Sequence, residues 1–257
     1  MNKEEHLVYF VGAGPGDPEL ITVKGARLLS EADLVVYAGS LVNPAVLDHC
    51  TEECEKADSA SLSLEEQVGI MSQAALAGRR VVRLHTGDPS LYGAVAEQKK
   101  RLEDMGIKVR FVPGVSSLQA AAAALGIEYT VPGGTQTLIC TRRKGRTPVP
   151  AGEDLSVLAG SGSTMVIFLS ADQAKDVAED LIKGGISPST PSACVYRASW
   201  KDERILRSPL EKLPVLMERE NIRRHALIIV GECIDQEEAR SLLYDPRFSH
   251  GYRRGEE

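Results

Sequence analysis

The chain has 257 residues, and its composition is close to that of an average globular protein. Hydrophobic residues make up 43% of the sequence and charged residues 26%, which excludes a disordered or fibrous protein. A chain of this length buries enough apolar surface to fold without disulfides or metals, as one large α/β domain or two smaller ones. The formal net charge of -6 argues against a nucleic-acid-binding protein, which needs an excess of Lys and Arg.

Five cysteines are scattered along the chain without a CxxC pair. This pattern fits a reducing compartment, so we expect a cytoplasmic protein with neither a disulfide framework nor a structural zinc site. The apolar run near the N-terminus is too short for the core of a signal peptide, and no window resembles a membrane span, so we expect no membrane association. The histidines lack the spacing of metal ligands, and we expect no metal site.

The first half of the chain alternates short β-rich runs with helical patterns. Ser63, followed by Glu66, forms a capping box that predicts the start of a helix ending near Gly78. Strands separated by helical stretches indicate βαβ units and a parallel sheet. The predicted strands cover residues 7–12, 34–37, 81–84 and 109–112, and further helices are predicted near 22–31, from about 91 and from about 117.

The pattern changes at residues 126–137, where Gly and Pro become frequent, and we place the domain boundary there. The later strands lie closer together in the sequence, so the segment 204–208 could return antiparallel beside 192–197, which predicts a mixed second sheet. The predicted fold class is α/β with two α/β domains, residues 1–128 and 129–234, followed by a polar tail at 235–257. The later strands are predicted at 137–140, 164–169, 192–197, 204–208 and 226–231, with helices at 172–183 and 211–219.

Three Gly-rich loops follow predicted strands of the first domain. They are GAGPGDP at 12–18, HTGDPSLYG at 85–93 and PGVSS at 113–117. Loops at the carboxyl ends of parallel strands gather along one edge of the sheet, where ligands bind, so we expect all three to face one crevice. The alternative is that each loop is only a strand-to-helix turn, which Gly, Pro, Asp and Ser also favour.

The first loop does not match the dinucleotide-binding fingerprint G-x-G-x-x-G, because Asp17 stands where the third glycine is required. The second strand ends in Tyr37 and Ala38 rather than in the acidic residue that binds a ribose. The chain also lacks a Walker loop and a G-x-S-x-G nucleophile elbow. These observations disfavour nicotinamide or flavin binding, P-loop chemistry and the commonest class of hydrolase.

A basic run, TRRKGRTPVP at 141–150, stands out in this acidic chain. It directly follows the first predicted strand of the second domain, a position that would bring Arg142, Arg143 and Arg146 to the ligand crevice. Guanidinium groups there suit a ligand with several carboxylates. A solvated loop is the alternative.

Several ordered motifs together resemble a known family, the tetrapyrrole methylases, which are class III S-adenosylmethionine-dependent methyltransferases. The resemblance covers essentially the whole chain. The basic run, YRASW at 196–200 and the tail segment LYDPRFSHGYR resemble those members that methylate carbon 11 of precorrin-4 or cobalt-precorrin-4 in cobalamin biosynthesis. The family motifs are VGAGPGDPELITVKG (11–25), YAGSLV (37–42), VRLHTGDPSLYGA (82–94), VPGVSS (112–117) and YRASWKDE (196–203).

The resemblance implies two α/β domains with S-adenosylmethionine in a cleft between them and S-adenosylhomocysteine as a product. It also implies a small tetrapyrrole substrate and a homodimer. We add Arg142, Arg146 and Tyr92 as candidates for binding the substrate. The cofactor-binding residues that the resemblance implies are Pro15, Thr86, Gly87, Asp88, Leu91, Ser116 and Ser117 in the first domain, and Leu169, Tyr196, Ala198 and Ala226 in the second.

One departure separates the chain from the uroporphyrinogen methyltransferases of this family, which carry an Asp directly after the tyrosine of the YAGSLV-like segment. Here Ala38 and Gly39 follow that tyrosine, and no catalytic base is assigned. We expect the mechanism to depend mainly on placing the ring carbon about 3–3.5 Å from the methyl group. The alternatives are another precorrin methyltransferase, a ribosomal-RNA ribose methyltransferase, which the net charge disfavours, and a non-catalytic tetrapyrrole or nucleotide sensor.

Overall fold

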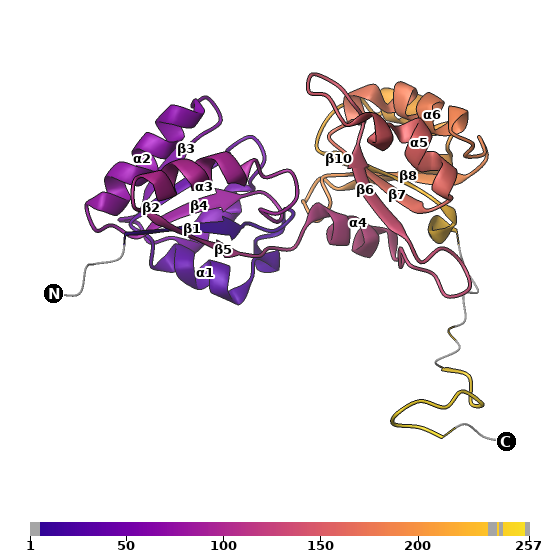
Figure 1. The fold of residues 1–257 in the computed structure, drawn as a ribbon, viewed down its shortest axis with the longest axis horizontal. Coiled ribbons are helices and arrows are strands. Elements are labelled where there is room, and N and C mark those ends of the chain that lie inside the picture. Colours follow the sequence, from indigo (N-terminus) through magenta and orange to yellow (C-terminus); the bar gives the residue numbers. More distant parts are fainter. Residues whose placement is uncertain (1–5, 236–240, 242–243, 255–257) are drawn as a thin grey trace. The chain divides into compact units, whose positions relative to one another are not determined.

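The computed structural model describes residues 6–235, 241 and 244–254 (Figure 1). The chain forms two compact units. The first unit comprises Met1–Ala120 and the short segment Ser199–Lys201, and the second comprises Ala121–Ala198 and Asp202–Glu257. The division after Ala120 falls within helix α4 (Ser117–Leu125), earlier than the Gly- and Pro-rich stretch at which the sequence analysis places the boundary.

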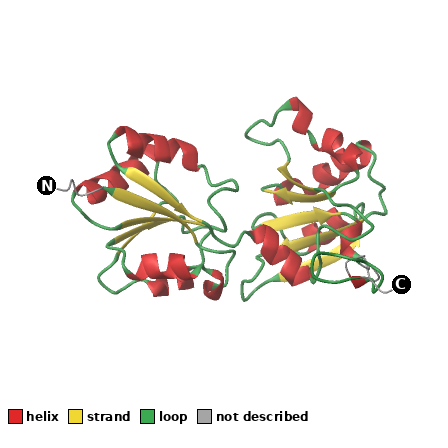
Figure 2. Ribbon diagram, turned by 60° about the horizontal axis from the view of Figure 1, so that its bottom comes forward, coloured by secondary structure: helices red, strands yellow, loops and turns green. Residues whose placement is uncertain are grey.

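The first unit contains a five-stranded sheet with the strand order β3-β2-β4-β1-β5. All of its strand pairings are parallel, as the βαβ pattern predicts. Helix α1 lies on one face of the sheet, and α2 and α3 lie on the other (Figures 1 and 2). The elements are β1 (Leu7–Gly12), β2 (Leu34–Tyr37), β3 (Glu55–Asp58), β4 (Val81–His85), β5 (Lys108–Val112), α1 (Val23–Ser30), α2 (Leu64–Leu76) and α3 (Val95–Asp104), with 3-10 helices at Pro18–Leu20 and Pro44–His49.

The interior strand β1, between β4 and β5, is buried on both faces, which explains its nearly continuous apolar sequence. Val8 and Phe10 pack toward α2 and α3, whereas Val11 packs toward α1. The predicted capping box at the start of α2 is confirmed: Ser63 Oγ accepts a hydrogen bond from the Glu66 amide at 3.2 Å, and the Glu66 carboxylate accepts one from the Ser63 amide at 2.7 Å.

Strand β3 is absent from the sequence prediction. Its residues, EKAD, are mostly exposed, and it pairs only with β2 at the edge of the sheet. An edge strand with this composition lacks the apolar alternation from which strands are recognised. Only its pairing with β2 identifies it.

The second unit contains a five-stranded mixed sheet with the order β6-β7-β10-β8-β9. Strands β6 and β7 are parallel, and the other neighbours are antiparallel. The antiparallel pair β8 and β9 confirms the predicted return of the chain beside residues 192–197. The elements are β6 (Leu138–Arg142), β7 (Thr164–Phe168), β8 (Pro191–Tyr196), β9 (Arg204–Pro209), β10 (Ala226–Val230), α5 (Leu155–Leu158), α6 (Ala174–Lys183) and α7 (Leu213–Arg219), with 3-10 helices at Ala151–Glu153, Ala159–Ser161, Ala171–Gln173 and Glu232–Ile234.

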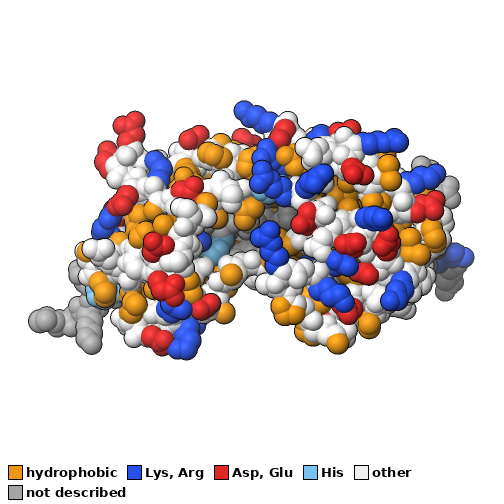
Figure 3. Space-filling view, turned by 90° about the horizontal axis from the view of Figure 1, so that it is seen from above, with side chains coloured by type: hydrophobic (Ala, Val, Ile, Leu, Met, Phe, Trp, Pro, Cys, Tyr) orange, Lys and Arg blue, Asp and Glu red, His pale blue; other side chains and the backbone are white. Residues whose placement is uncertain are grey.

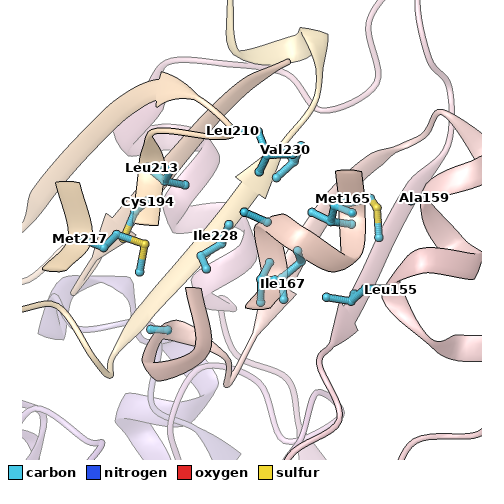
Figure 4. Close-up of a cluster of buried hydrophobic side chains, with 14 of the residues drawn as sticks. Leu155, Ala159, Met165, Ile167, Cys194, Leu210, Leu213, Met217, Ile228 and Val230 are labelled. Atoms are coloured by element: carbon cyan, nitrogen blue, oxygen red, sulfur yellow. The ribbon is translucent and has the colours of Figure 1, made fainter. Parts of the chain in front are cut away.

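An apolar core fixes the helices of the second unit against its sheet (Figure 4). Met165 and Ile167 on β7 and Ile228 on β10 belong to this core and are at most 1% exposed. Leu155 of α5 and Met217 of α7 belong to the same cluster. Burial of such side chains contributes roughly 1.5–3 kcal/mol each, so the sheet holds the ends of its strands in fixed positions.

On the face shown in Figure 3, Lys and Arg side chains are interspersed with Asp and Glu on each unit. In the part of the chain that the structure describes, no helix combines the length and the apolar character needed to cross a bilayer. The predicted tail at 235–257 lies only partly within the described residues. In its described part, His250 and Arg253 form an isolated β-bridge, whereas residue 243, the first of the tail motif, lies outside it.

Candidate functional site

The three Gly-rich loops meet at the carboxyl edge of the first sheet. A Cβ atom on Gly12, at the end of β1, would lie 2.6 Å from the Cα of Gly114 and 2.6 Å from the carbonyl oxygen of Gly87. A Cβ atom on Gly114 would likewise collide with the Gly87 carbonyl. Because any side chain at Gly12 or Gly114 would separate the loops, glycine is required where the backbones touch.

Backbone hydrogen bonds join the first two of these loops. The Gly87 amide donates to the Gly14 carbonyl at 2.8 Å, and the Gly14 amide donates to the Gly87 carbonyl at 3.3 Å. The Ala13 amide also donates to the carbonyl of His85 at 2.7 Å. Gly14 and Gly87 have φ values of 80° and 60°, a conformation that favours glycine.

Asp88 joins the second loop to the third. One carboxylate oxygen accepts hydrogen bonds from the amide and hydroxyl of Ser90, and the other accepts one from the Gly114 amide at 2.8 Å. Burial raises the pKa of Asp88, but the hydrogen bonds from Ser90 and Gly114 outweigh this effect, and the pKa lies below its usual range. Asp88 is therefore a carboxylate at neutral pH.

The third loop leads into α4, whose first residue is Ser117. The side chain of the buried Ser116 accepts a hydrogen bond from the Leu118 amide at 3.2 Å. Among the described residues, the amides of Val115 and Ser116 find no backbone or side-chain acceptor. Amides at the start of a helix attract anions, so this end of α4 is suited to a carboxylate group.

Three further predicted residues flank Asp88 at this edge. Thr86 is exposed, Leu91 is half-buried, and Tyr92 is 43% exposed. Tyr92 and Ala94 have positive φ values of 56° and 48°, which makes the turn after Asp88 unusual for residues other than glycine. The structure thus places the predicted residues of the first unit, apart from Pro15, on the second and third loops.

Pro15 lies in the first loop, and its surroundings include residues that the sequence analysis did not predict. Its carbonyl accepts a hydrogen bond from the indole Nε1 of Trp200 at 2.9 Å. The side chain of Asn43 donates to the Gly16 carbonyl at 2.7 Å. The Asp17 amide donates to Ser199 Oγ at 3.0 Å. A local motif does not reveal such contacts, because Trp200 and Pro15 are 185 residues apart in the sequence.

Two buried polar residues of β4 lie beneath this edge, and neither was predicted as functional. The Arg83 guanidinium donates to Gln98 and Gln67, to Ser59 and to the Val36 carbonyl, all of them neutral groups. Burial lowers its pKa to about 10.

His85 lies at the end of the same strand, with its ring centroid 5.3 Å from that of Phe10. Burial, followed by the charge of Arg83, lowers the pKa of His85 to about 3. Its Nε2 atom is buried and finds no hydrogen-bond partner among the described residues. The imidazole is therefore neutral at physiological pH.

The predicted residues of the second unit share one edge of the second sheet. Ala226, at the start of β10, pairs in register with Tyr196 at the end of β8. Because β10 is also antiparallel to β7, the start of β10 lies beside the end of β7. Leu169 is the first residue after β7. Leu169 is 66% exposed, with a φ of 51°, whereas Ala198 is buried. Arg204 lies over the Tyr196 ring, 4.6 Å from its centroid.

Arg142 ends β6, in register with Phe168 of β7, and therefore belongs to the same edge. Its guanidinium donates to the carbonyls of Arg143, Thr147 and Pro148, and so braces the loop that follows. Arg146, at the tip of this loop, is exposed, and among the described residues it makes no hydrogen bond or ion pair. The two arginines predicted to bind substrate thus differ in their surroundings.

Arg143 is directed away from the loop tip. It contacts Asp180 at 2.7 Å, Gln173 at 2.6 Å and Asp176 at 3.3 Å, and so ties the loop to α6. Lys144 pairs with Asp154 at 3.1 Å. In contrast to the expectation that Arg143 faces the ligand, its charge is matched within the second unit. The sequence shows the basic run but not these acidic partners.

Among the described residues, no group of three potential ligands could hold a metal ion. The segment that departs from the uroporphyrinogen enzymes lies at the end of β2. There the Asp58 carboxylate accepts a hydrogen bond from the Gly39 amide at 2.9 Å and occupies the space that a side chain at Gly39 would need.

The chain is similar to known proteins along nearly its whole length. A cobalt-precorrin-4 C(11)-methyltransferase of Methanocaldococcus jannaschii is 50% identical over 96% of both chains, and a precorrin-4 C(11)-methyltransferase of Pseudomonas aeruginosa is 44% identical over 97% of this chain and 99% of its own. The solved structure of a cobalt-precorrin-4 methyltransferase matches with a TM-score of 0.89 and 44% identity, over 92% of this chain and 99% of that one.

A uroporphyrin-III C-methyltransferase of Thermus thermophilus, solved with S-adenosylhomocysteine, matches with a TM-score of 0.76 and 33% identity, over 92% of this chain and 98% of that one. The sequence model of the family described as tetrapyrrole (corrin/porphyrin) methylases matches residues 7–214. The chain therefore belongs to the tetrapyrrole methylases.

Proposed function

We propose that this protein transfers a methyl group from S-adenosylmethionine to carbon 11 of precorrin-4 or cobalt-precorrin-4 in cobalamin biosynthesis. The observation that carries the proposal is high identity over nearly the full length of named relatives. The relatives from M. jannaschii and Priestia megaterium are 50% and 46% identical, and both are named cobalt-precorrin-4 C(11)-methyltransferase. We therefore regard the cobalt form as the first substrate to test.

The carboxyl edge of the first sheet fits a donor that carries both a carboxylate and an ammonium group. The amides of Val115 and Ser116, at the start of α4, are suited to the carboxylate. Asp88 is ionised, and the oxygen that accepts from Gly114 retains a lone pair that an ammonium group can use. These groups support the predicted donor-binding role of Asp88, Ser116 and Ser117.

The bound donor supplies a methyl group on a positively charged sulfur. The protein's task is to orient this group toward a nucleophilic ring carbon, because correct alignment accounts for a large part of such a barrier. The close contacts among Gly12, Gly87 and Gly114 fix the three loops in place before the donor binds. A preformed site does not have to reorganise during the reaction.

The second unit offers one charged group suited to an acidic tetrapyrrole. Arg146 is exposed and unpaired among the described residues, so it can pair with a peripheral carboxylate without first losing another partner. Arg142 instead fixes the loop that carries Arg146. Tyr92 of the first unit remains a further candidate for contact with the substrate.

Uroporphyrinogen is a less suitable substrate on two grounds. The related uroporphyrin-III enzyme of T. thermophilus is only 33% identical, and Ala38 replaces the acidic residue that follows the tyrosine in that group. We expect the protein to act in the cytoplasm, because all five cysteines are free, and to form a homodimer that does not bind nucleic acid. Sedimentation analysis measures the oligomeric state.

The decisive experiment supplies methyl-labelled S-adenosylmethionine together with cobalt-precorrin-4, precorrin-4 or uroporphyrinogen III. We expect label to appear at carbon 11 of one or both precorrin-4 forms, with one equivalent of S-adenosylhomocysteine released. Transfer to uroporphyrinogen alone would contradict the substrate assignment. Binding of S-adenosylhomocysteine without transfer to any of the three would favour the non-catalytic sensor.

A further inference from the structure

We propose that Trp200 is a positioning residue that holds residues 14–17 of the first Gly-rich loop in their binding conformation. Trp200 belongs to the segment Ser199–Lys201, which joins β8 to β9 in the sequence but is part of the first unit. Pro15 of this loop is a predicted donor-binding residue, so the kinetic part of the proposal rests on the proposed function. The structural part does not depend on it.

Polar contacts from outside the loop fix three consecutive residues. The indole of Trp200 donates to the Pro15 carbonyl at 2.9 Å, and Ser199 Oγ accepts from the Asp17 amide at 3.0 Å. Asn43 donates to the carbonyl of Gly16 at 2.7 Å. Pro15 and Gly16 are buried, so a carbonyl left without a hydrogen-bond partner there would destabilise the loop. The conformation of this loop therefore depends on the 199–201 segment.

Gly16 fits the loop to the indole. An ideal Cβ atom on Gly16 would overlap the Trp200 ring, lying 2.8 Å from its Cγ and closer still to Cδ1 and Nε1. The three nearest atoms to this Cβ all belong to Trp200, and the φ of Gly16 lies outside the left-handed region. Glycine is therefore needed at this position because of the indole and not because of the backbone conformation.

A loop that is held in place before binding does not have to be ordered by the donor, which lowers the entropic cost of association. Trp200 thus acts on the donor through Pro15, and we expect its loss to weaken donor binding more than it slows methyl transfer. Trp200 is the single tryptophan of the chain, so the intrinsic fluorescence of the protein reports directly on this contact.

The test compares Gly16→Ala, Trp200→Phe, Trp200→Ala and the double variant Gly16→Ala/Trp200→Ala in the full chain. Gly69→Ala is the matched control, because a Cβ atom at Gly69 in α2 meets no atom within 4 Å. Emission and acrylamide quenching are measured without ligand, and affinity for S-adenosylhomocysteine is measured by calorimetry. Circular dichroism confirms that each variant is folded, and steady-state kinetics separate KM from kcat.

We expect Gly16→Ala, but not Gly69→Ala, to shift the emission to longer wavelength and to increase quenching. Trp200→Ala and Gly16→Ala should each weaken S-adenosylhomocysteine binding by about tenfold, and Trp200→Phe, which keeps an aromatic ring but loses the N–H donor, by about threefold. The double variant should bind as Trp200→Ala does, because the added methyl group then has no ring to displace. KM for the donor should rise while kcat stays within about twofold.

The proposal would be overturned if Gly16→Ala kept the emission of wild type. It would also be overturned if folded Trp200→Phe and Gly16→Ala both bound S-adenosylhomocysteine with wild-type affinity. Fully additive losses in the double variant would also overturn it, because they would show that Gly16 acts independently of the indole. If instead wild-type protein fails to bind S-adenosylhomocysteine, the proposed function is wrong, and the fluorescence of ligand-free Gly16→Ala still tests the contact.

Discussion

Asp88 connects two loops through a carboxylate whose pKa is lowered by hydrogen bonds from Ser90 and Gly114. In Asp88→Asn, one carboxylate acceptor becomes a donor, so either the Gly114 amide or the Ser90 amide loses its partner. We expect the free energy of unfolding at pH 7 to fall by about 1–2 kcal/mol. Because the folded pKa lies below the unfolded one, this stabilisation is fully present above pH ~4 and is lost as the pH falls through the folded value.

Urea unfolding at pH 7, 5 and 3 measures this effect. The difference between wild type and Asp88→Asn should be equal at pH 7 and 5 and smaller at pH 3. A difference that stays constant down to pH 3 would show that the charge of Asp88 does not stabilise the loops. A loss of S-adenosylhomocysteine affinity in the same folded variant, measured by calorimetry, would support a direct role for Asp88 in donor binding.

His85 responds to acid in a higher pH range. Its pKa is lowered to about 3 by burial and by Arg83, so the folded protein resists taking up a proton that the unfolded chain binds near pH 6.5. The contribution of the neutral imidazole is present above pH ~6.5 and is lost, at up to about 1.4 kcal/mol per pH unit, as the pH falls toward 3.

In His85→Gln, this proton uptake disappears. We expect the free energy of unfolding of the variant to depend on pH less steeply than that of wild type between pH 6 and 4. The difference in slope should correspond to close to one proton taken up on unfolding. Parallel pH profiles for the two proteins would mean that His85 is not buried as a neutral ring. Asp88→Asn serves as the matched control, because its own change is confined to lower pH.

At the scale of single elements, the end of β6 and the loop after it carry two arginines with different surroundings. Arg142 donates to three carbonyls of the loop, whereas Arg146 has no partner among the described residues. Arg142→Ala should lower the midpoint of thermal unfolding, whereas Arg146→Ala should leave it unchanged and raise KM for the tetrapyrrole about tenfold. Both should bind S-adenosylhomocysteine within about twofold of wild type.

Kinetics with a precorrin-4 substrate, together with differential scanning fluorimetry, test both expectations. Arg146→Lys is a useful companion variant, because a bidentate contact with a carboxylate would not survive the exchange, whereas a purely electrostatic contact would. Wild-type KM in Arg146→Ala would identify this tip as solvated and direct attention to Tyr92. An unchanged thermal midpoint in Arg142→Ala would show that its carbonyl contacts do not stabilise the loop.

The sequence predicts those elements whose signal is local. The buried strand β1, the capping box at Ser63 and the three glycine loops are predicted, because periodicity and turn chemistry act over short distances. Strand β3 is missed because its four residues are mostly exposed, and Arg143 is misplaced because its partners lie on α6. The contact of Trp200 with Pro15 depends on the tertiary fold, and no local pattern predicts it.

At the scale of the whole molecule, we expect the 199–201 segment to couple the unfolding of the two units. These residues pack in the first unit, but the strands on either side of them belong to the second. If the second unit unfolds, the strands that direct Trp200 to the first loop are lost. If the first unit unfolds, the loop itself is lost. In either case we expect the half-buried indole to become more exposed to solvent.

We therefore expect Trp200 emission to change fully in the first unfolding transition during urea denaturation, whichever unit unfolds first. Far-ultraviolet circular dichroism, which follows both sheets, shows whether a second transition remains afterwards. Red-shifted emission that accompanies only the later of two transitions would contradict this expectation. Coincident transitions would show that the units unfold cooperatively, which the same linkage permits.

The return of the 199–201 segment to the first unit also constrains recombination between family members. A chimaera that joins residues 1–120 of another methylase to the remainder of this chain inherits Trp200 from one parent and position 16 from the other. A parent with any residue larger than glycine at position 16 would bring a side chain into the space of the indole. Exchange of the two halves therefore preserves the conformation of the first loop only when the residues at positions 16 and 200 fit each other.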